Sequence, residues 1–422
     1  MTRERPAILY VVPGHDFLPS AGPTRNVLNQ VRAMQQWADV TIAVRRIADP
    51  LPPSPDAPRV LEIAPSIGRA GTAVDDAATR GMGYREFAAY LRALRVLLEH
   101  ELPSTDLVLE KDWMLTGYAA HHARRFGVPG IAVKNWIATA QNGGLRAPVA
   151  ALRHALAAHL EGWFLRRATG IVAETETLRA SIARRWRIDP ARISVIGLGV
   201  DRARFSPGDQ PGARTRLGIA LSRTVLLYAG VLDRTHDLEP LLHALAGYAP
   251  ERVELHVIGD GPRRGALERI AADARVPVTF HGRVPHDAVA DYIAAADLCV
   301  APYDRTCFPH GEVGYSTLKV REYLSAGRAV ATVPSGALRT LVRHETTGFL
   351  LENDADAWRD LLRTLPPRER LREMGRAAAA SELESWDDVG RAFQRLCAQH
   401  MAAPAPAASE AVGAIPYEAR RI

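Results

Sequence analysis

A chain of 422 residues is too long for one ordinary domain, and its composition, 47% hydrophobic and 24% charged, is that of a globular protein able to bury two cores. Its three cysteines show no CxxC spacing and leave an odd number, which argues against a disulfide framework or a zinc site and indicates a reducing, cytoplasmic setting. The net charge of +6 suits an anionic partner, either a phosphate-bearing substrate or an acidic membrane surface, whereas the basic motifs of nucleic-acid modules are missing, so no nucleic acid is expected.

Strand-like apolar runs alternate with helix-period segments, which predicts an α/β fold with parallel sheets covered by helices. The opening MTRERPAILYVVPG has a short apolar run that indicates a first strand and not an export signal, and no stretch reaches the roughly 18 apolar residues of a membrane span. A helix with Val27, Val31 and Met34 on one face follows, so the chain opens with a βαβ unit. The predicted strands of this half are 7–12, 40–44, 106–110, 130–133, 170–173 and 193–196, and the proline-rich segment 49–58 is a loop.

Residues 146–167, RAPVAALRHALAAHLEGWFLRR, form a basic segment with helical periodicity. One side of this helix carries Leu152, Leu156, Leu160 and Trp163. The pattern favours an ordinary packed helix with a solvated basic face. The alternative is a helix that docks on a membrane, where it would serve a lipid-linked acceptor.

The periodicity stops at residues 197–208, GLGVDRARFSPG, which we interpret as a hinge between domains. It restarts with predicted strands at 224–228, 253–258, 278–280, 298–301 and 329–333. The predicted organisation is a Rossmann-like domain at 1–200, a second at 201–384, a last helix at 385–399 and a disordered tail at 400–422, which is rich in Ala, Pro and Ser.

Polar residues cluster where the predicted strands end, and in open parallel sheets ligands bind beyond these carboxyl ends. The clusters are His15-Asp16, 110–112, Lys134-Asn135, 234–236, 259–261, Tyr303-Asp304 and Ser335-Gly336. Two such edges that face each other would form one interdomain cleft. Gly22, just before the first helix, would let a ligand approach the backbone beside a helix N-terminus.

The segment IGDGPRRGALERI, from Ile258, has glycines in the order G-x-G-x-x-x-G. The last interval is one residue too long for a dinucleotide fingerprint, and the segment lies in the second half of the chain. A dehydrogenase is therefore disfavoured, and we expect a tight glycine turn before a helix.

Another short helix is predicted after the loop at 311–315, and its first turn carries the wrong charge. Lys319 and Arg321 lie there, although a helix N-terminus disfavours cations. An anion bound to the amides of Thr317 and Leu318 would make the cations favourable, and Glu322, one turn further in, would then hold a ribose. The alternative is a solvated helix with a Lys319–Glu322 ion pair.

Four segments together resemble the group-1, or family 4, nucleotide-sugar glycosyltransferases. They are GLGVDRARFSPG, YAGVLDRTHDLEPLLHAL, the run from LHVIGDGPRRG to LCVAPY, and the run from STLKVREYLSAG to GFLLEND. The resemblance covers most of residues 7–400 and implies the GT-B fold, with nucleotide-sugar on the second domain, acceptor on the first, and a last helix that crosses back to the first domain. It also implies a retaining enzyme that needs no metal and no cofactor besides its nucleotide-sugar substrate.

Residue by residue, the resemblance implies donor contacts at Gly22, Arg283, Val284, Ser316, Thr317, Leu318 and Glu322. The chain departs from the family at its phosphate clamp. The usual arginine of that clamp falls at Val231 and its lysine near His236, so Arg234, His236 and Lys319 are expected to supply the positive charge instead.

The catalytic positions depart as well. The first glutamate of the family's E-x7-E motif falls at Gly314, and Glu312 would replace it only if the loop is rebuilt. A histidine often found in the first domain falls near Lys111. We therefore take Glu312 and Lys111 as the catalytic candidates, and the residues expected on the acceptor side are His15, Asp16 and Asn135.

The function predicted from these residues is transfer of a hexose-type sugar from a nucleotide diphosphate to an acceptor hydroxyl. The alternatives are a GT-B nucleotide-sugar epimerase or hydrolase, and a catalytically idle member that binds nucleotide-sugar. The acceptor is either a small molecule or lipid-linked, and in the second case the protein would also contact the inner face of the membrane.

Overall fold

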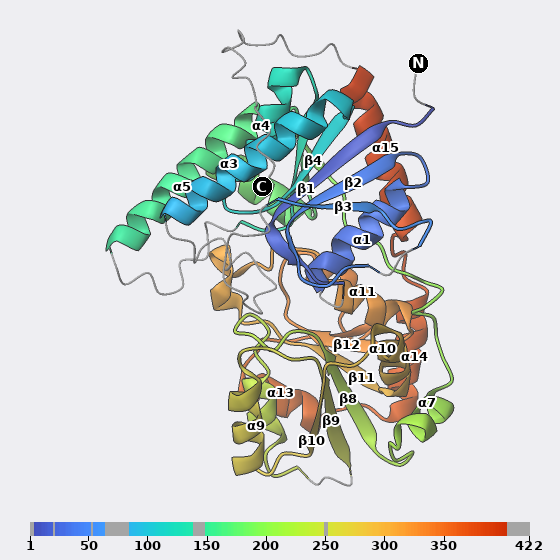
Figure 1. The fold of residues 1–422 in the computed structure, drawn as a ribbon. Coiled ribbons are helices and arrows are strands. Elements are labelled where there is room, and N and C mark those ends of the chain that lie inside the picture. The colour runs from blue at the N-terminus through green and yellow to red at the C-terminus, as the bar shows by residue number, and fades with distance from the viewer. Residues whose placement is uncertain are drawn as a thin grey trace.

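Two α/β units, each built on a parallel sheet covered by helices, make up the chain, and this confirms the predicted fold class (Figure 1). The computed structural model describes residues 4–19, 22–51, 54–63, 84–137, 148–248 and 252–402. The strand orders are β3-β2-β1-β4-β5-β6-β7 in the first unit and β10-β9-β8-β11-β12-β13 in the second. Both sheets start in the middle and add strands outward in both directions, as in doubly wound folds.

The first unit contains every strand that the sequence predicted in this half. Its strands are β1 (Ala7–Phe17), β2 (Asp39–Ile47), β3 (Arg59–Glu62), β4 (Leu107–Lys111), β5 (Gly130–Lys134), β6 (Gly170–Ala173) and β7 (Ile193–Val195). Its helices are α1 (Gly22–Met34), α3 (Tyr84–Glu101), α4 (Tyr118–Ala123), α5 (Pro148–Arg167) and α6 (Glu176–Trp186). The sequence missed β3, a four-residue edge strand after the proline-rich loop, because its pattern is too short to show alternation.

The second unit repeats this architecture. Its strands are β8 (Thr224–Ala229), β9 (Val253–Ile258), β10 (Val278–Gly282), β11 (Leu298–Ala301), β12 (Ala329–Thr332) and β13 (Gly348–Leu350). Its helices are α7 (Gln210–Leu217), α8 (Glu239–Leu245), α9 (Arg264–Asp273), α10 (His286–Ala295), α11 (Leu318–Ser325), α12 (Leu338–Leu341), α13 (Ala355–Arg363) and α14 (Arg368–Ala379). The edge strand β13, three residues long, was missed for the same reason as β3.

The apolar runs along the strands fill a core on each face of each sheet. In β1, Ile8 and Tyr10 pack with α1, while Leu9 and Val11 point to the other face and pack with α3. Successive side chains of a strand point to opposite faces, so a continuous apolar run is what a doubly covered strand requires.

The last helix, α15 (Trp386–Ala402), packs against α1 of the first unit (Figure 1). Val389 and Phe393 enter the core that β1 and α1 share, and a Cβ atom on Gly390 would lie 2.8 Å from the Ala33 carbonyl oxygen. At its start, Ser385 forms a parallel bridge with Val200, within the segment we interpreted as a hinge. The helix runs three residues beyond the predicted end at 399, and most of the expected tail, 403–422, lies outside the described residues.

Helix α5 presents Leu156 and Leu160 to solvent, so the favoured interpretation of this segment as an ordinary packed helix is wrong for these two leucines. Leu156 is 57% exposed and Leu160 is 36% exposed. The face that packs carries Ala157, Glu161 and Leu165 instead. The side chain of Leu152 lies outside the described part. Among the described residues, no helix is long and apolar enough to cross a membrane.

Candidate functional site

The start of α11 lies directly beneath α1, at the boundary between the two units (Figure 1). Its N-cap is Thr317, whose extended backbone ends the loop, and the helix begins at Leu318. Within the described residues the Thr317 side chain makes no capping hydrogen bond, so it does not satisfy the first helix amides. The structure therefore places the predicted anion-binding turn where two domains meet.

Lys319 turns away from its own helix toward the end of β8. Its ammonium donates to the Tyr228 hydroxyl at 3.1 Å and lies 4.4 Å from the centre of the Tyr228 ring. A Cβ atom on Gly230 would lie 2.5 Å from the ammonium nitrogen, so any larger residue there would displace the Lys319 side chain. Burial lowers the pKa of Lys319 to about 7, against the opposing effect of Asp233. The free protein thus holds a poorly solvated cation at a helix N-terminus.

Glu322 lies one turn further along α11 and is surrounded by cations from three elements. Burial raises the pKa of Glu322 to about 7, although Arg25, Lys319 and Arg204 each lower it. Arg25 comes from α1 in the first unit, one turn after Gly22. Sequence reasoning missed Arg25, because a cation on one domain gives no sign of a carboxylate on the other.

His236 and Arg234 follow β8, as expected of replacements for the phosphate clamp. The His236 Nδ1 atom lies 3.0 Å from an Asp233 carboxylate oxygen, and its Nε2 atom lies 3.2 Å from the Tyr315 hydroxyl. Burial and the nearby Lys319 lower the pKa of His236, so it offers hydrogen bonds and not positive charge at neutral pH. Arg234 is exposed beside it. We expected Arg234, His236 and Lys319 to supply the positive charge of the phosphate clamp. His236 does not supply it.

Glu312 holds a loop together and is not free to act as the catalytic carboxylate that we expected. It accepts hydrogen bonds from the Gly336 amide at 2.6 Å and from the Arg339 guanidinium at 3.0 and 3.1 Å. Burial alone would raise the pKa of Glu312, but these hydrogen bonds lower it. The loop is not rebuilt to bring Glu312 to the position of Gly314. The Gly314 carbonyl oxygen instead accepts a hydrogen bond of 2.5 Å from Thr175 of the other unit.

Lys111 is likewise held in an ion pair, with Glu174. Its ammonium lies 3.2 Å from a carboxylate oxygen of Glu174, which also accepts from the Asn26 amide at 3.3 Å, and all three side chains are buried. Burial works against the charged form, but Tyr10 and Glu174 outweigh it and raise the pKa of Lys111, so its ammonium stays charged. Because Glu174 directly precedes Thr175, this pair fixes the loop that bonds to Gly314. Lys111 therefore supports the contact between the units.

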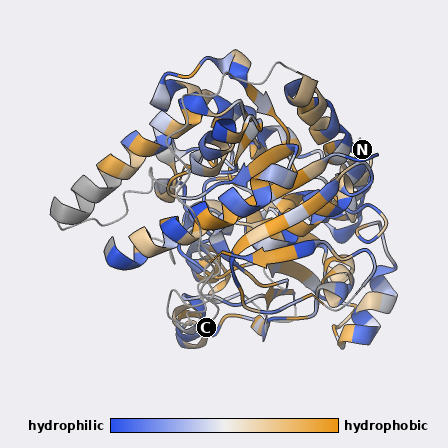
Figure 2. Cartoon of the chain, turned by 45° about the horizontal axis from the view of Figure 1, so that its top comes forward, coloured by the Kyte–Doolittle hydropathy of each residue, from blue (hydrophilic) through white to orange (hydrophobic). Residues whose placement is uncertain are grey.

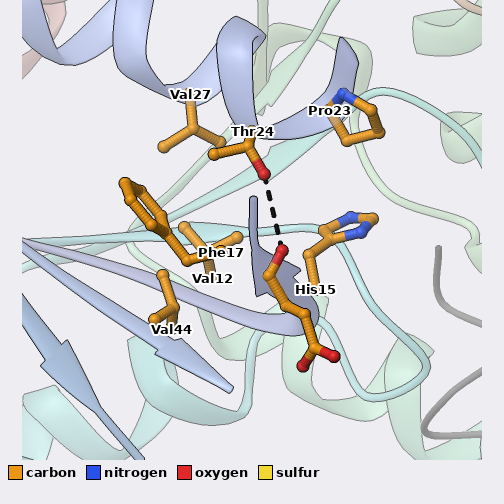
Figure 3. A pocket seen from close by; sticks show the side chains of 8 residues that line it. Val12, His15, Phe17, Pro23, Thr24, Val27 and Val44 are labelled. Carbon is orange, nitrogen blue, oxygen red and sulfur yellow. Dashed lines mark hydrogen bonds between the residues drawn. The ribbon is translucent and has the colours of Figure 1, made fainter. Parts of the chain in front are cut away.

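The acceptor-side candidates His15 and Asp16 lie beside a small pocket and a pair of arginines. Asp16 is buried, and its carboxylate forms ion pairs with Arg45 at 2.6 Å and with Arg46 at 2.8 Å. His15 lines a pocket of about 10 Å³, in which the Thr24 hydroxyl donates to the Asp16 backbone oxygen (Figure 3). That volume holds about one water molecule and not an acceptor. The Asp16 carboxylate is thus paired within the first unit, and the expectation that His15 and Asp16 lie on the acceptor side stays a prediction.

Asn135 lies against Asp112 at the end of β5. With its amide nitrogen toward the carboxylate, Asn135 donates to both oxygens of Asp112 at 2.7 and 3.0 Å. Asp112 also lies 3.6 Å from the buried Lys134 ammonium, which contacts Glu161 of α5 at 2.7 Å. This network ties β4, β5 and α5 together, and its residues have their partners inside the first unit.

The remaining donor candidates differ in their exposure. Arg283 is exposed, 3.9 Å from Asp260, and Val284 packs against the core of the second unit. Ser316 is buried and accepts a hydrogen bond of 3.2 Å from Arg321. Only 12% of the Arg321 side chain is exposed. Arg321 therefore braces the loop before α11.

Comparison with known proteins matches each unit to a glycosyltransferase family model. Residues 21–204 match the family Glycosyltransferase Family 4, and residues 223–365 match the family Glycosyl transferases group 1. A protein named D-inositol 3-phosphate glycosyltransferase from Geodermatophilus obscurus is 28% identical over 415 residues, which cover 91% of this chain and 85% of the relative. A protein of the same name from Streptomyces scabiei is 28% identical over 84% of this chain and 81% of its own length.

Solved structures of similar fold cover nearly the whole chain. A sucrose-phosphate synthase from Thermosynechococcus elongatus has a TM-score of 0.74 at 19% identity and covers 94% of this chain and 99% of its own. The structure of HepE from Anabaena in complex with UDP and glucose has a TM-score of 0.67 at 16% identity and covers 93% and 99%. Because the two family matches span both α/β units and the fold agrees, the chain belongs to the group 1, family 4 glycosyltransferases, which have the GT-B fold.

Proposed function

We propose that this glycosyltransferase takes a sugar from a nucleoside-diphosphate donor and transfers it, with retention, to an acceptor hydroxyl. The observation that carries the proposal is the start of α11, where Lys319 and Glu322 lie near each other at the domain boundary and Arg25 of the first unit lies near Glu322. The helix amides and the ammonium suit a diphosphate, and the carboxylate suits the vicinal hydroxyls of a ribose.

The proposed chemistry is displacement at the anomeric carbon. The bond from that carbon to the diphosphate oxygen breaks and its electron pair stays on the diphosphate, while the acceptor oxygen bonds to the same face of the sugar and its proton passes to the leaving group. Negative charge develops on the diphosphate, where the amides of Thr317 and Leu318 and the Lys319 ammonium stabilise it. The chain's contribution is therefore chiefly electrostatic, which needs no nucleophile at Gly314.

A second candidate function has an observation in its favour. The family's first carboxylate is absent at Gly314, and Glu312 is bound to Arg339 and Gly336, which favours a member that binds nucleotide-sugar without transferring it. A nucleotide-sugar epimerase or hydrolase is the further alternative, and it would consume the donor without an acceptor.

A two-stage experiment separates these functions. Nucleotide-sugars that bind only the folded state raise the melting temperature, so a thermal-shift screen identifies the donor. The best donor is then incubated with a phosphorylated polyol, because relatives bear the name D-inositol 3-phosphate glycosyltransferase, and with a lipid-linked alcohol. We expect an acceptor-dependent product with the donor's anomeric configuration. Binding without turnover would identify an idle member, and turnover without acceptor would identify a hydrolase or epimerase.

We also propose that transfer needs no metal ion. Among the described residues, no group of three or more His, Cys, Asp or Glu side chains could hold one. Activity is therefore expected to survive an excess of EDTA, since helix amides and Lys319 neutralise the diphosphate directly. Loss of transfer on chelation, with recovery on addition of Mn²⁺ or Mg²⁺, would show that a metal ion bridges the diphosphate.

A further inference from the structure

The outward face of α5 combines exposed leucines with an aromatic residue and a cation. Leu156 and Leu160 are exposed, and at 100° per residue they share one face of the helix with Trp163 and Arg167. The Arg167 guanidinium lies 3.7 Å from the centre of the Trp163 ring. Hydrophobic residues, drawn in orange, recur along the described part of α5 (Figure 2). This is the reverse of an ordinary surface helix, whose leucines face the core.

The Trp163 ring is held in place by its neighbours. His121 of α4 packs edge-on against it with 4.9 Å between ring centres, and Phe164 lies 5.1 Å away in the same manner. The Arg124 guanidinium donates to the Arg167 backbone oxygen at 2.8 Å. The apolar face of α5 is thus bordered by an ordered aromatic and basic edge.

On the other border of α5, a broad open depression of about 340 Å³ is strongly basic. Arg166 of α5 and Arg185 and Arg187 at the end of α6 line it, together with His159, Ala158 and Trp186, and no carboxylate is among these lining residues. Arg166 donates to the Trp186 backbone oxygen at 3.1 Å, and the Trp186 indole donates to the Ala158 backbone oxygen at 3.0 Å. The three arginines therefore surround the Trp186 indole, whose position is fixed by a hydrogen bond.

We propose that α5 and the end of α6 form a docking surface for an anionic lipid bilayer. Two features point to this occupant together. The arginines on the borders match the phosphates of acidic lipid headgroups, whose surface potential attracts clustered cations. Leu156 and Leu160 between them match the boundary of headgroups and acyl chains, where the apolar face of an interfacial helix lies. Docking in this way is peripheral and reversible, and it weakens as salt screens the charges. The proposal does not depend on the donor assignment.

Vesicle co-sedimentation tests the proposal with the full chain. Vesicles of phosphatidylcholine with about a third phosphatidylglycerol should sediment the protein at low salt, whereas pure phosphatidylcholine vesicles should bind it about tenfold less, because attraction of arginines to the surface is lost. The double variant Arg185→Gln/Arg187→Gln should lower the affinity for anionic vesicles about tenfold. Leu156→Ser/Leu160→Ser should also lower this affinity about tenfold, and by the same factor at every salt concentration. Tryptophan fluorescence should shift to the blue on binding.

Matched controls come from the other unit. Arg359→Gln/Arg363→Gln removes the same charge from α13, and Leu221→Ser removes a leucine that is 56% exposed; neither should change vesicle binding. If Arg359→Gln/Arg363→Gln loses as much affinity for anionic vesicles as Arg185→Gln/Arg187→Gln, net charge alone explains the binding and the proposal is overturned. The absence of binding to anionic vesicles would overturn it as well. A dimer in light scattering that Leu156→Ser/Leu160→Ser dissociates would assign the face to a second copy. Thermal shifts with nucleotide-sugars are expected to be the same in all variants, which separates this test from that of the donor site.

Discussion

Replacing Lys319 by glutamine is expected to weaken the binding of a nucleoside diphosphate by about tenfold or more, while the free protein stays as stable as before or becomes slightly more stable. In the free protein the ammonium is poorly solvated and lies at a helix N-terminus, and both features disfavour its charge. With a diphosphate bound, the helix amides and the ammonium act on the same negative charge. The charge of Lys319, which costs free energy in the free protein, then contributes favourably to the free energy of binding.

Calorimetric titration of the diphosphate and of the nucleoside, together with melting temperatures, checks this expectation. The nucleoside should bind Lys319→Gln and the parent alike. Arg359→Gln is the matched control, since it removes one cation from the far surface of the same unit, whereas Arg321 is unsuitable because it braces Ser316. Equal diphosphate affinity in Lys319→Gln and the parent would mean that the phosphates bind elsewhere.

The same lysine predicts a dependence on pH. Its pKa falls from 10.5 in the unfolded chain to about 7 in the folded one, so between these values the unfolded state binds more protons and stability rises with pH relative to Lys319→Gln. A bound diphosphate favours the charged form. Between about pH 8 and about pH 9.5, the diphosphate affinity of the parent should therefore fall as pH rises, while that of Lys319→Gln stays level. Parallel slopes in the two proteins would contradict the contact.

Glu322→Ala is expected to weaken nucleotide, nucleotide-sugar and nucleoside together by about tenfold or more, since all three carry the ribose that the carboxylate would hold by charge-assisted hydrogen bonds. Glu322 is one turn inside the helix start, with Arg25 and Lys319 near it. These cations favour the charged form of the carboxylate, against the burial that raises its pKa to about 7, and hydroxyl donors from a ligand would favour it further. The measurement is calorimetric titration with all three ligands.

Two comparisons make the Glu322 test specific. Inorganic pyrophosphate should bind Glu322→Ala as well as the parent, since it lacks the ribose. Glu322→Gln keeps the shape and one acceptor oxygen, so its loss should be smaller than that of alanine. Unchanged nucleoside affinity in a folded Glu322→Ala would remove the ribose assignment, and so would an equal loss for pyrophosphate.

The sequence by itself determined the fold. Its apolar runs and helix periods are local signals, so they marked every long strand of both sheets and the final helix. Of the strands in the described part of the chain, only the short edge strands β3 and β13 were not predicted. The start of α11 was also readable, because Thr317, Lys319 and Glu322 are neighbours on one helix and their spacing fixes their relative positions.

The tertiary structure alone decided which of the other polar groups are free to act. Asp16, Glu312 and Lys111 all stand at strand ends or in site loops, yet their partners are Arg45, Arg339 and Glu174, each far away in the sequence. Periodicity could not show these partners, because a buried charge is neutralised by whichever opposite charge the packing brings near.

The same reason applies to α5. Helical spacing put its leucines on one face, but whether that face meets a core or the solvent depends on what the rest of the chain packs against it. Here Ala157 and Leu165 face the core, and the buried Glu161 pairs with Lys134 on the same side, so Leu156 and Leu160 face the solvent. The local pattern fixes which residues share a face, and only tertiary packing decides which face is buried.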